Sequence, residues 1–294
     1  MTETLPKSSN PLPLRERMKI PRQQMREQPA QQRVLNFHEV NLGYSAELAQ
    51  QEARRCLECQ KPTCMTSCPV GVKVREFVRL IVADDFAGAA AVIREDNVLP
   101  AVTGRVCPQE DHCEAGCVLH KKGLSLGIGY LERFVADYEM KNGVSAPVEV
   151  PDEFHPEKVA IIGAGPAGLS CAYFLAKAGY HSVVFEALPE PGGMFRYGIP
   201  EYRLPTPTLM HEINWILSHG AELRCNTRIG KDISFDEIVA QFDAVFIGVG
   251  AHKGMKLRIQ GEDLEGVVDG VDFLREVNGG KKWPAKGRVI VVGG

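Results

Sequence analysis

Seven of the nine cysteines in this 294-residue chain lie in two short groups. The first group has the spacing C-x2-C-x4-C-x3-C, and the second has C-x5-C-x3-C. The members are Cys56, Cys59, Cys64, Cys68, Cys107, Cys113 and Cys117. The first ten residues contain no apolar run of a secretory signal, so we expect a cytoplasmic protein. There, clustered cysteines usually bind metal or do redox chemistry rather than form disulfides.

An iron–sulfur centre is the interpretation that best fits the first group. Pro69 follows Cys68, and a Cys-Pro end is typical of bacterial ferredoxins, whose fourth cysteine ligates the other of two clusters. Two [4Fe-4S] clusters need about eight ligands. Glu132, on a predicted helix after the second group, is the candidate for the eighth. Because a carboxylate is a harder donor than a thiolate, such a cluster should be electronically distinct.

Zinc is an alternative that the same cysteines leave open. His112 or His120 could complete the ligands of two structural zinc ions. Zinc sites usually contain two short knuckles, and only Cys56 and Cys59 have the C-x2-C spacing. Reactive thiols without metal are a third alternative.

A second motif begins at Lys158 with a buried-strand pattern, continues through a glycine-rich turn and a helix, and ends in a second strand. This is the βαβ dinucleotide fingerprint in its required context. The turn should hold a pyrophosphate at the helix N-terminus, and the acid after the second strand should take the ribose hydroxyls. The candidate residues are Gly163, Gly165, Ala167, Gly168 and Glu186.

The residues that follow favour FAD over NAD. Gly192 and Gly193, followed by Met194, would leave space for a second phosphate and a ribityl chain, although an ordinary turn is the alternative. Residues 243–250 are predicted to form a later core strand that ends in small residues. Residues 287–294 predict the first strand and glycines of a second fingerprint, without its helix. We therefore expect the NADPH site to be largely missing from this chain.

The elements that must position these residues divide the chain into five parts. Residues 1–34 form a polar arm, and residues 35–140 are expected to be short amphipathic helices around the cysteines. Residues 141–157 form a proline-containing linker, 158–287 an FAD-binding domain, and 288–294 the first strand of a truncated NADPH-binding domain. The predicted fold class is α/β: a helical two-cluster domain, then a Rossmann-like domain.

The composition is that of an ordinary globular protein. Hydrophobic residues make up 44% and charged residues 24%, and the net charge is −3. We therefore expect no nucleic-acid partner. No apolar run approaches the ~20 residues of a membrane-spanning helix, so we expect no membrane association.

The order of these motifs resembles a known family. The two cysteine groups precede KVAIIGAGPAGL at 158–169 and GGMFRYGIPEYRLP at 192–205. This order resembles the NADPH-dependent glutamate synthase small subunit. It is also similar to the large subunit of NADH-dependent reduced ferredoxin:NADP oxidoreductase and to the N-terminal part of dihydropyrimidine dehydrogenase. The C-x5-C-x3-C spacing is closer to the latter two, which bears on the substrate and not on the cofactors.

The resemblance implies two [4Fe-4S] clusters with interleaved ligands. One would be held by Cys56, Cys59, Cys64 and Cys117, and the other by Cys68, Cys107, Cys113 and Glu132. The implied flavin residues are those of the glycine turn, with Glu186, Gly193, Met194, Arg203 and the weaker match Ile229.

The family relationship also implies a function. Electrons would pass between NADPH, FAD and the clusters, to or from a catalytic or electron-accepting partner subunit that could contain FMN. The flavin supplies the chemistry, so we predict no catalytic side chain. The most favoured function is that of a glutamate synthase small subunit. Two alternatives are the large subunit of an electron-bifurcating, sulfide dehydrogenase-like transhydrogenase and a truncated cofactor-binding module without turnover.

Overall fold

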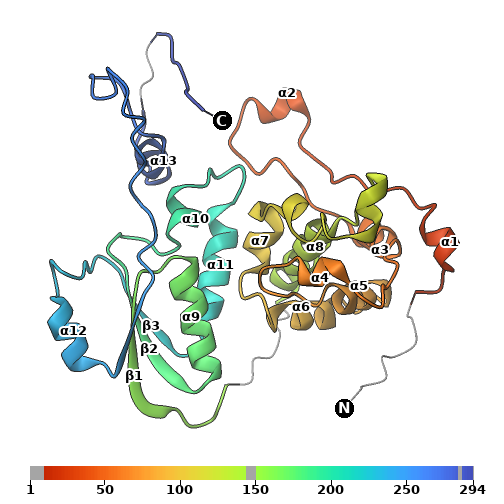
Figure 1. The fold of residues 1–294 in the computed structure, drawn as a ribbon, viewed down its shortest axis with the longest axis horizontal. Coiled ribbons are helices and arrows are strands. Elements are labelled where there is room, and N and C mark those ends of the chain that lie inside the picture. Colours follow the sequence, from red (N-terminus) through yellow and green to blue (C-terminus); the bar gives the residue numbers. More distant parts are fainter. Residues whose placement is uncertain (1–9, 144–149, 284–286, 294) are drawn as a thin grey trace.

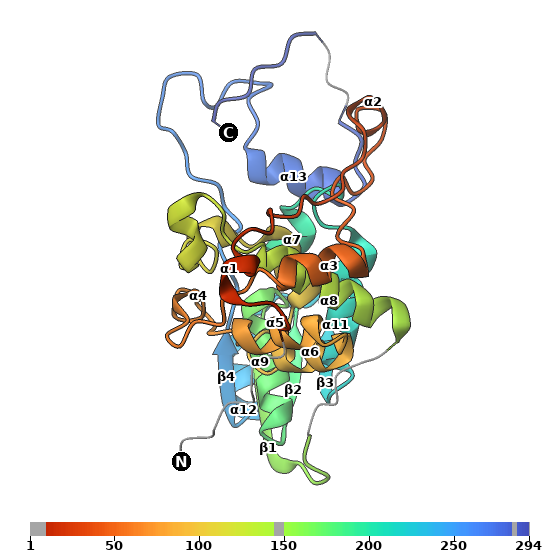
Figure 2. The ribbon, with the colours of Figure 1, turned by 90° about the vertical axis from the view of Figure 1, so that its right-hand side faces the viewer.

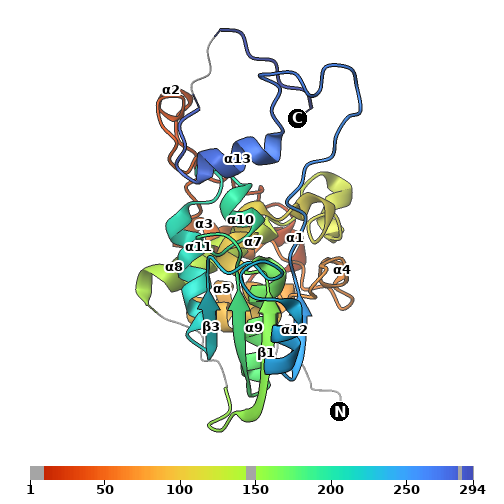
Figure 3. The same ribbon diagram turned by 90° about the vertical axis from the view of Figure 1, so that its left-hand side faces the viewer.

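The computed structural model describes residues 10–143, 150–283 and 287–293. A helical N-terminal part lies beside a parallel sheet that is flanked by helices (Figure 1). The helical part faces the viewer in Figure 2, and the sheet side faces the viewer in Figure 3. This is the predicted α/β class, with short helices before a Rossmann-like unit.

Two helices of the N-terminal part agree with the sequence prediction: one begins at the predicted cap, and the other buries the predicted apolar face. Helix α3 (Ala46–Ala53) begins after Ser45, whose Oγ accepts a hydrogen bond from the Leu48 N–H at 3.3 Å. On α5 (Val74–Val82), the four apolar residues at helical spacing are all buried. The other helices are α6 (Phe86–Arg94), α7 (Pro100–Val106) and α8 (Ile128–Asn142), with the short α1 (Leu14–Arg17), α2 (Ala30–Arg33), α4 (Thr63–Thr66), η1 (Gln109–Asp111) and η2 (Val118–Lys122).

The sheet has four parallel strands in the order β3-β2-β1-β4. The strands are β1 (His155–Ile162), β2 (Tyr180–Phe185), β3 (Ala221–Arg224) and β4 (Ala244–Ile247). Helices α9 (Pro166–Lys177) and α11 (Thr206–Leu217) lie on one side and α12 (Phe235–Gln241) on the other, with α10 (Met194–Tyr197) and α13 (Gly270–Asn278) above the sheet (Figure 1). Parallel strands joined by helices place the functional loops at the carboxyl edge of the sheet.

The second hydrophobic core joins the helical part to the sheet part. It combines Val98, Leu99 and Val102, at the start of α7, with Leu169 on α9 and Ile213 on α11. A separate core holds the helices together around α5, α6 and α8. Helix α7 therefore belongs structurally to both parts of the molecule.

A buried ion network lies at this junction. The Arg94 guanidinium on α6 contacts Glu139 on α8 at 2.6 Å and Glu212 on α11 at 2.7 Å. It also stacks on Trp215, 3.9 Å from the ring centroid. The other Glu212 oxygen accepts the Ala101 N–H of α7 at 2.8 Å. The four charged and aromatic side chains are buried, so the network fixes three helices of the cysteine-bearing part against α11.

Three predicted boundaries differ from the structure. The strand predicted in the core at 243–250 is β4, which lies at the edge of the described sheet with Phe246 and Ile247 exposed. The strand predicted near the C-terminus is absent from the described residues 287–293, where no neighbouring backbone pairs with it. The linker predicted at 141–157 is shortened by α8 and β1, and its residues 144–149 lie outside the described residues, as do 1–9 and 294.

Across the three described ranges, none of the helices has the length and apolarity that a bilayer crossing requires.

Candidate functional site

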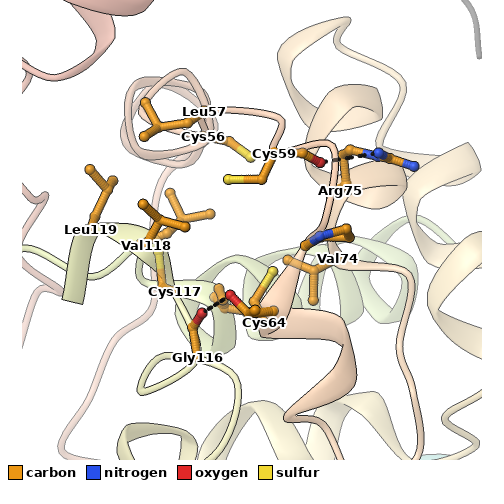
Figure 4. A pocket seen from close by; sticks show the side chains of 14 residues that line it. Cys56, Leu57, Cys59, Cys64, Val74, Arg75, Gly116, Cys117, Val118 and Leu119 are labelled. Atoms are coloured by element: carbon orange, nitrogen blue, oxygen red, sulfur yellow. Dashed lines mark hydrogen bonds between the residues drawn. The ribbon is translucent and has the colours of Figure 1, made fainter. Parts of the chain in front are cut away.

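Four thiols from both cysteine groups line one pocket, which we call the first site (Figure 4). They belong to Cys56, Cys59, Cys64 and Cys117. The two chain segments meet where the Thr63 hydroxyl donates to the Gly116 carbonyl at 2.5 Å. Apolar side chains complete much of the wall, among them Leu57, Val74, Leu119, Leu126 and Ile128. Four sulfur donors in an apolar pocket suit a soft metal centre.

Three arginines surround the 56–59 loop of the first site. Arg17, on the N-terminal arm, donates to the Cys56 carbonyl at 3.0 Å, and Arg75 donates to the Cys59 carbonyl at 3.2 Å. Arg79 pairs with Glu58 at 3.1 Å, and Arg17 lies 3.7 Å from the same carboxylate. The arm is therefore anchored at this site through a buried Arg17 and is not a freely solvated segment.

Burial raises the pKa of three first-site thiols, those of Cys56, Cys59 and Cys64. Burial raises the pKa of Cys56 to about 12 and that of Cys64 to about 11, the latter helped by the thiols of Cys117 and Cys59. Burial also raises the pKa of Cys59. Such thiols are protonated and poorly nucleophilic at neutral pH, which disfavours the reactive-thiol alternative. A positively charged metal would reverse these shifts, because ligation requires the thiolate.

The remaining predicted ligands form a second group, which we call the second site: Cys68, Cys107, Cys113 and Glu132. Burial raises the pKa of Cys107 to about 11, and the Glu132 carboxylate and the Cys68 thiol raise it further. The pKa of Cys113 is raised by burial and by the same two neighbours. The thiols of Cys107 and Cys113 therefore lie within electrostatic range of the Glu132 carboxylate and of Cys68. Cys68 is coupled to this group, although Cys64, four residues earlier, lines the first site.

Glu132 is buried on α8, and only one of its two carboxylate oxygens accepts hydrogen bonds from the described residues. Its Oε1 accepts hydrogen bonds from Thr103 Oγ1 at 2.5 Å and from Asn97 Nδ2 at 3.0 Å. Burial raises the pKa of Glu132 to about 7, while the Thr103 hydrogen bond opposes that shift. Both of these hydrogen bonds end on Oε1, and among the described residues none ends on Oε2. One carboxylate oxygen is thus available as a donor beside the thiols.

The two histidines of the zinc alternative lie outside the first-site lining. His120 is exposed and its Nδ1 lies 3.1 Å from Ser125 Oγ, and His112 ends η1. Within the described ranges, no three His, Cys, Asp or Glu side chains already converge on one metal-ion position. Four of the predicted sulfur donors line one pocket, and electrostatic coupling relates Cys107 and Cys113 to Glu132 and Cys68. Seven sulfurs and one carboxylate are chemically suitable donors for iron–sulfur clusters.

The glycine turn of the sheet part has the geometry that the fingerprint predicts. Gly163 has φ +106° between β1 and α9. A Cβ on Gly168 would lie 1.9 Å from the Gly163 carbonyl oxygen, so only glycine allows the helix to approach the turn this closely. No side chain caps the α9 N-terminus, which leaves its first amides directed at the space beyond the turn.

Glu186 and the glycine pair lie against this turn. Glu186 follows β2 and accepts the Ala164 and Leu188 N–H groups, each at 2.9 Å. Gly192 donates its N–H to the Ala164 carbonyl at 2.8 Å. The Gly192–Gly193 pair is thus packed on the phosphate-type turn despite its distance in sequence, as the flavin interpretation requires.

The other predicted flavin residues occupy three different positions. Met194 begins α10 directly after the glycine pair. Arg203 lines a cavity of about 300 Å³ with Val106, the last residue of α7, which precedes Cys107. Ile229 packs in the small core on the α12 side of the sheet. The cavity therefore brings the loop of Arg203 close to Val106, the residue before Cys107.

Comparisons with known proteins agree with this division. Residues 33–144 match the family described as dihydropyrimidine dehydrogenase domain II, 4Fe-4S cluster. Residues 161–221 match the NAD(P)-binding Rossmann-like domain family. The iron–sulfur match covers both cysteine groups and Glu132, and the Rossmann match covers the glycine turn and Glu186.

Three curated relatives span both parts. The chain is 39% identical over 272 residues to the NADPH-Fe(3+) oxidoreductase subunit beta of Geobacter sulfurreducens, covering 90% of this chain and 40% of that one. It is 35% identical over 246 residues to the glutamate synthase [NADPH] small chain of Escherichia coli, covering 84% and 52%. It is 36% identical over 258 residues to the NAD-dependent dihydropyrimidine dehydrogenase subunit PreT of Salmonella typhimurium, covering 87% and 62%.

The chain belongs to the glutamate synthase small-chain-like family of iron–sulfur oxidoreductases. It spans 40 to 62% of the length of the three curated relatives named above.

Within this family fold, sequence reasoning missed the polar residues that support the predicted ligands. Asn97 and Thr103 bind the Glu132 carboxylate, and Arg17 binds the Cys56 backbone. These residues stand in no motif. One local signal could have pointed to Asn97. An Asn side chain can accept the backbone N–H two residues later, and Asn97 Oδ1 accepts the Leu99 N–H at 3.1 Å.

Proposed function

We propose that this chain is an electron-transfer oxidoreductase subunit that binds FAD and two [4Fe-4S] clusters. The first cluster would be held by Cys56, Cys59, Cys64 and Cys117, and the second by Cys68, Cys107, Cys113 and Glu132. The flavin would exchange a hydride with NADPH, and the clusters would carry single electrons. The subunit role we favour is that of the NADPH glutamate synthase small chain, with electrons passing to or from a partner subunit.

The observation that carries the proposal is the sorting of eight donors into two groups of four. Supporting the separation of the two halves of the first cysteine group, Cys64 lines the first pocket, whereas Cys68 is electrostatically coupled to Cys107 and Cys113. Conversely, Cys117 belongs to the second cysteine group but lines the first pocket. An interleaved arrangement of this kind suits two clusters better than two independent zinc knuckles, whose ligands are usually paired along the chain.

FAD is proposed for the Rossmann-like part, although the matching family is described as NAD(P)-binding. The α9 N-terminus would take the pyrophosphate, and each Glu186 oxygen retains a lone pair for a ribose hydroxyl. The contact of Gly192 with the turn supports an extended flavin chain. Arg203 and Met194 would lie along the flavin part, and the Ile229 loop lies beside Glu186 through the Thr227 N–H.

Anaerobic purification followed by cofactor analysis tests the proposal. We expect about eight iron and eight acid-labile sulfide per chain, with one FAD released on denaturation. Stoichiometric zinc without sulfide would overturn the cluster assignment. Bound NAD(P) without flavin would overturn the FAD assignment and leave the clusters intact.

The cysteine spacing supports a second candidate for the partner. The C-x5-C-x3-C group resembles that of transhydrogenase large subunits, so the chain could serve an electron-bifurcating NADH/ferredoxin:NADP enzyme. Stopped-flow mixing of the cluster-loaded chain with reduced ferredoxin distinguishes the two. Rapid flavin reduction by ferredoxin favours the transhydrogenase, and its absence favours the glutamate synthase type.

A further inference from the structure

We propose that Asn97 and Thr103 are positioning residues that direct one carboxylate oxygen of Glu132 at the second cluster. The inference rests on the proposed role of Glu132 as a cluster ligand. It assigns a function to two polar side chains on the far side of that carboxylate, outside both cysteine groups.

Both residues donate to the same oxygen. Thr103 Oγ1 lies 2.5 Å and Asn97 Nδ2 lies 3.0 Å from Glu132 Oε1. Asn97 Nδ2 also donates to Thr103 Oγ1 at 2.7 Å, so the three side chains form a closed triangle. Since Oε1 is occupied twice and Oε2 has no partner among the described residues, the carboxylate is prepared to ligate through Oε2 alone.

The orientation of the Asn97 amide is determined by the backbone. Its Oδ1 accepts the Leu99 N–H at 3.1 Å, so the opposite end of the amide must be the donating Nδ2. The Thr103 hydroxyl accepts from Asn97 and has one hydrogen to donate, and both Glu132 Oε1 at 2.5 Å and the Leu99 carbonyl at 3.0 Å are within its reach. The contact with the carboxylate is the shorter of the two and is charge-assisted, so it is the favoured one. The backbone therefore sets the donor direction of Asn97, and the carboxylate sets that of Thr103.

The frame around the triangle is rigid. Thr103 lies on α7 beside Gly104, where a Cβ would lie 2.7 Å from the Arg133 backbone nitrogen of α8. The two helix backbones are thus in contact beside Glu132. Gln109, close to Cys107, donates to the Thr103 carbonyl at 3.1 Å. The same helix that orients Glu132 therefore ends at Cys107 and positions both ligands.

Two consequences for the cluster follow. Partners that hydrogen-bond a ligand fix its orientation and tune the metal, and donors withdraw electron density from the ligating group. Removing a donor should make Glu132 a stronger electron donor and lower the midpoint potential of the second cluster. It should also allow the carboxylate to rotate, which weakens the retention of iron.

The test compares four variants of the anaerobically purified, cluster-loaded chain. Thr103→Val removes the hydroxyl and keeps the side-chain shape, while Thr103→Ser keeps the hydroxyl. Asn97→Asp keeps the acceptor for Leu99 and replaces the donor with a carboxylate that repels Glu132. Asn142→Ala removes an exposed amide from the end of the same helix α8 and is the matched control.

Electron paramagnetic resonance during a potentiometric titration, with iron and sulfide content, gives the readout. We expect Thr103→Val and Asn97→Asp to alter the second-cluster spectrum and shift its potential downward, with up to half of the iron lost. The first-cluster spectrum should not change, and Thr103→Ser and Asn142→Ala should match the parent protein.

Glu132→Ala separates the two ways of failing. If it changes the second-cluster spectrum and the Thr103→Val and Asn97→Asp variants do not, the positioning role is wrong and the ligand assignment stands. If Glu132→Ala leaves the spectrum unchanged, the ligand assignment is wrong and the positioning role is overturned with it. A lowered melting temperature with unchanged spectra would show a purely structural role and would also overturn the inference.

Discussion

The two cysteine sites differ in their donors and in their surroundings. The first site has four thiols in a largely apolar pocket, and the surrounding arginines are Arg17 on the N-terminal arm and Arg75 and Arg79 on helix α5. The second site has three thiols and the buried carboxylate of Glu132, and it is built on the helix pair α7 and α8. Positive groups near a cluster stabilise its reduced form, while a carboxylate ligand disfavours it. If each site holds a cluster, as proposed, the comparison predicts a higher midpoint potential for the one at the first site.

The sites also differ in how they are connected to the sheet part. Helix α7 shares a core with α9 and α11, and its first turn is bound by Glu212. The first site is instead reached by the N-terminal arm. The helix that ends at Cys107 of the second site is therefore packed directly against the nucleotide-binding part, although the ligands proposed for the two sites alternate along the chain.

The largest expected effect is the selective loss of one cluster. Cys59→Ala should remove the first-site cluster and Cys113→Ala the second, each with loss of about half of the iron and sulfide. The remaining spectrum should differ between the two variants. Loss of both clusters in either variant would mean that the sites are not independent, which iron analysis and electron paramagnetic resonance would reveal.

Breaking the ion network at the junction of the two parts should destabilise the whole fold. Arg94→Met would leave Glu139 and Glu212 buried without their cation and should lower the free energy of unfolding by about 3–5 kcal/mol. Denaturant titration measures this loss. The control is Arg224→Met, whose exposed pair with Glu222 should be worth less than about 1 kcal/mol. Equal losses in both variants would contradict the role of the junction.

The buried ion network should also make the free energy of unfolding depend on pH through Glu212. Burial raises the pKa of Glu212, with the Arg94 charge opposing it. A carboxyl group whose pKa is higher in the folded state binds more protons when folded, so the free energy of unfolding falls as pH rises above the ordinary carboxyl pKa of about 4.3. Glu212→Gln should remove this component, at most about 1.4 kcal/mol per pH unit. Parallel stability profiles from pH 4 to 8 would count against it.

The smallest expected effect concerns the arm. Arg17→Met removes a cation and its hydrogen bond to the Cys56 carbonyl, so the first-cluster potential should fall by a few tens of millivolts while the second stays constant. Arg15→Met, on the exposed face of the same short helix, is the matched control. A potentiometric titration in which both clusters shift together would show a global effect and not a local one.

Elements whose signals are local could be predicted from the sequence. The Ser45 cap and the apolar spacing of α5 predicted helices that form as expected, because capping and amphipathic burial depend on residues within one or two turns. The glycine turn and Glu186 after β2 could also be predicted. The close approach that requires glycine at Gly163 and Gly168 occurs between elements that are adjacent in sequence. The spacing of the cysteines indicated metal chemistry but did not by itself divide them into sites.

Only the tertiary structure decided which distant residues meet. Cys117 joins Cys64 across a loop contact, and Arg94 meets Glu212 across 118 positions of sequence. The Asn97–Thr103–Glu132 triangle depends on the close approach of α7 and α8 at Gly104. Such contacts depend on how whole helices pack against one another. A buried polar group needs a hydrogen-bond partner, but many different residues can provide it, so no periodicity or motif along the chain identifies the partner.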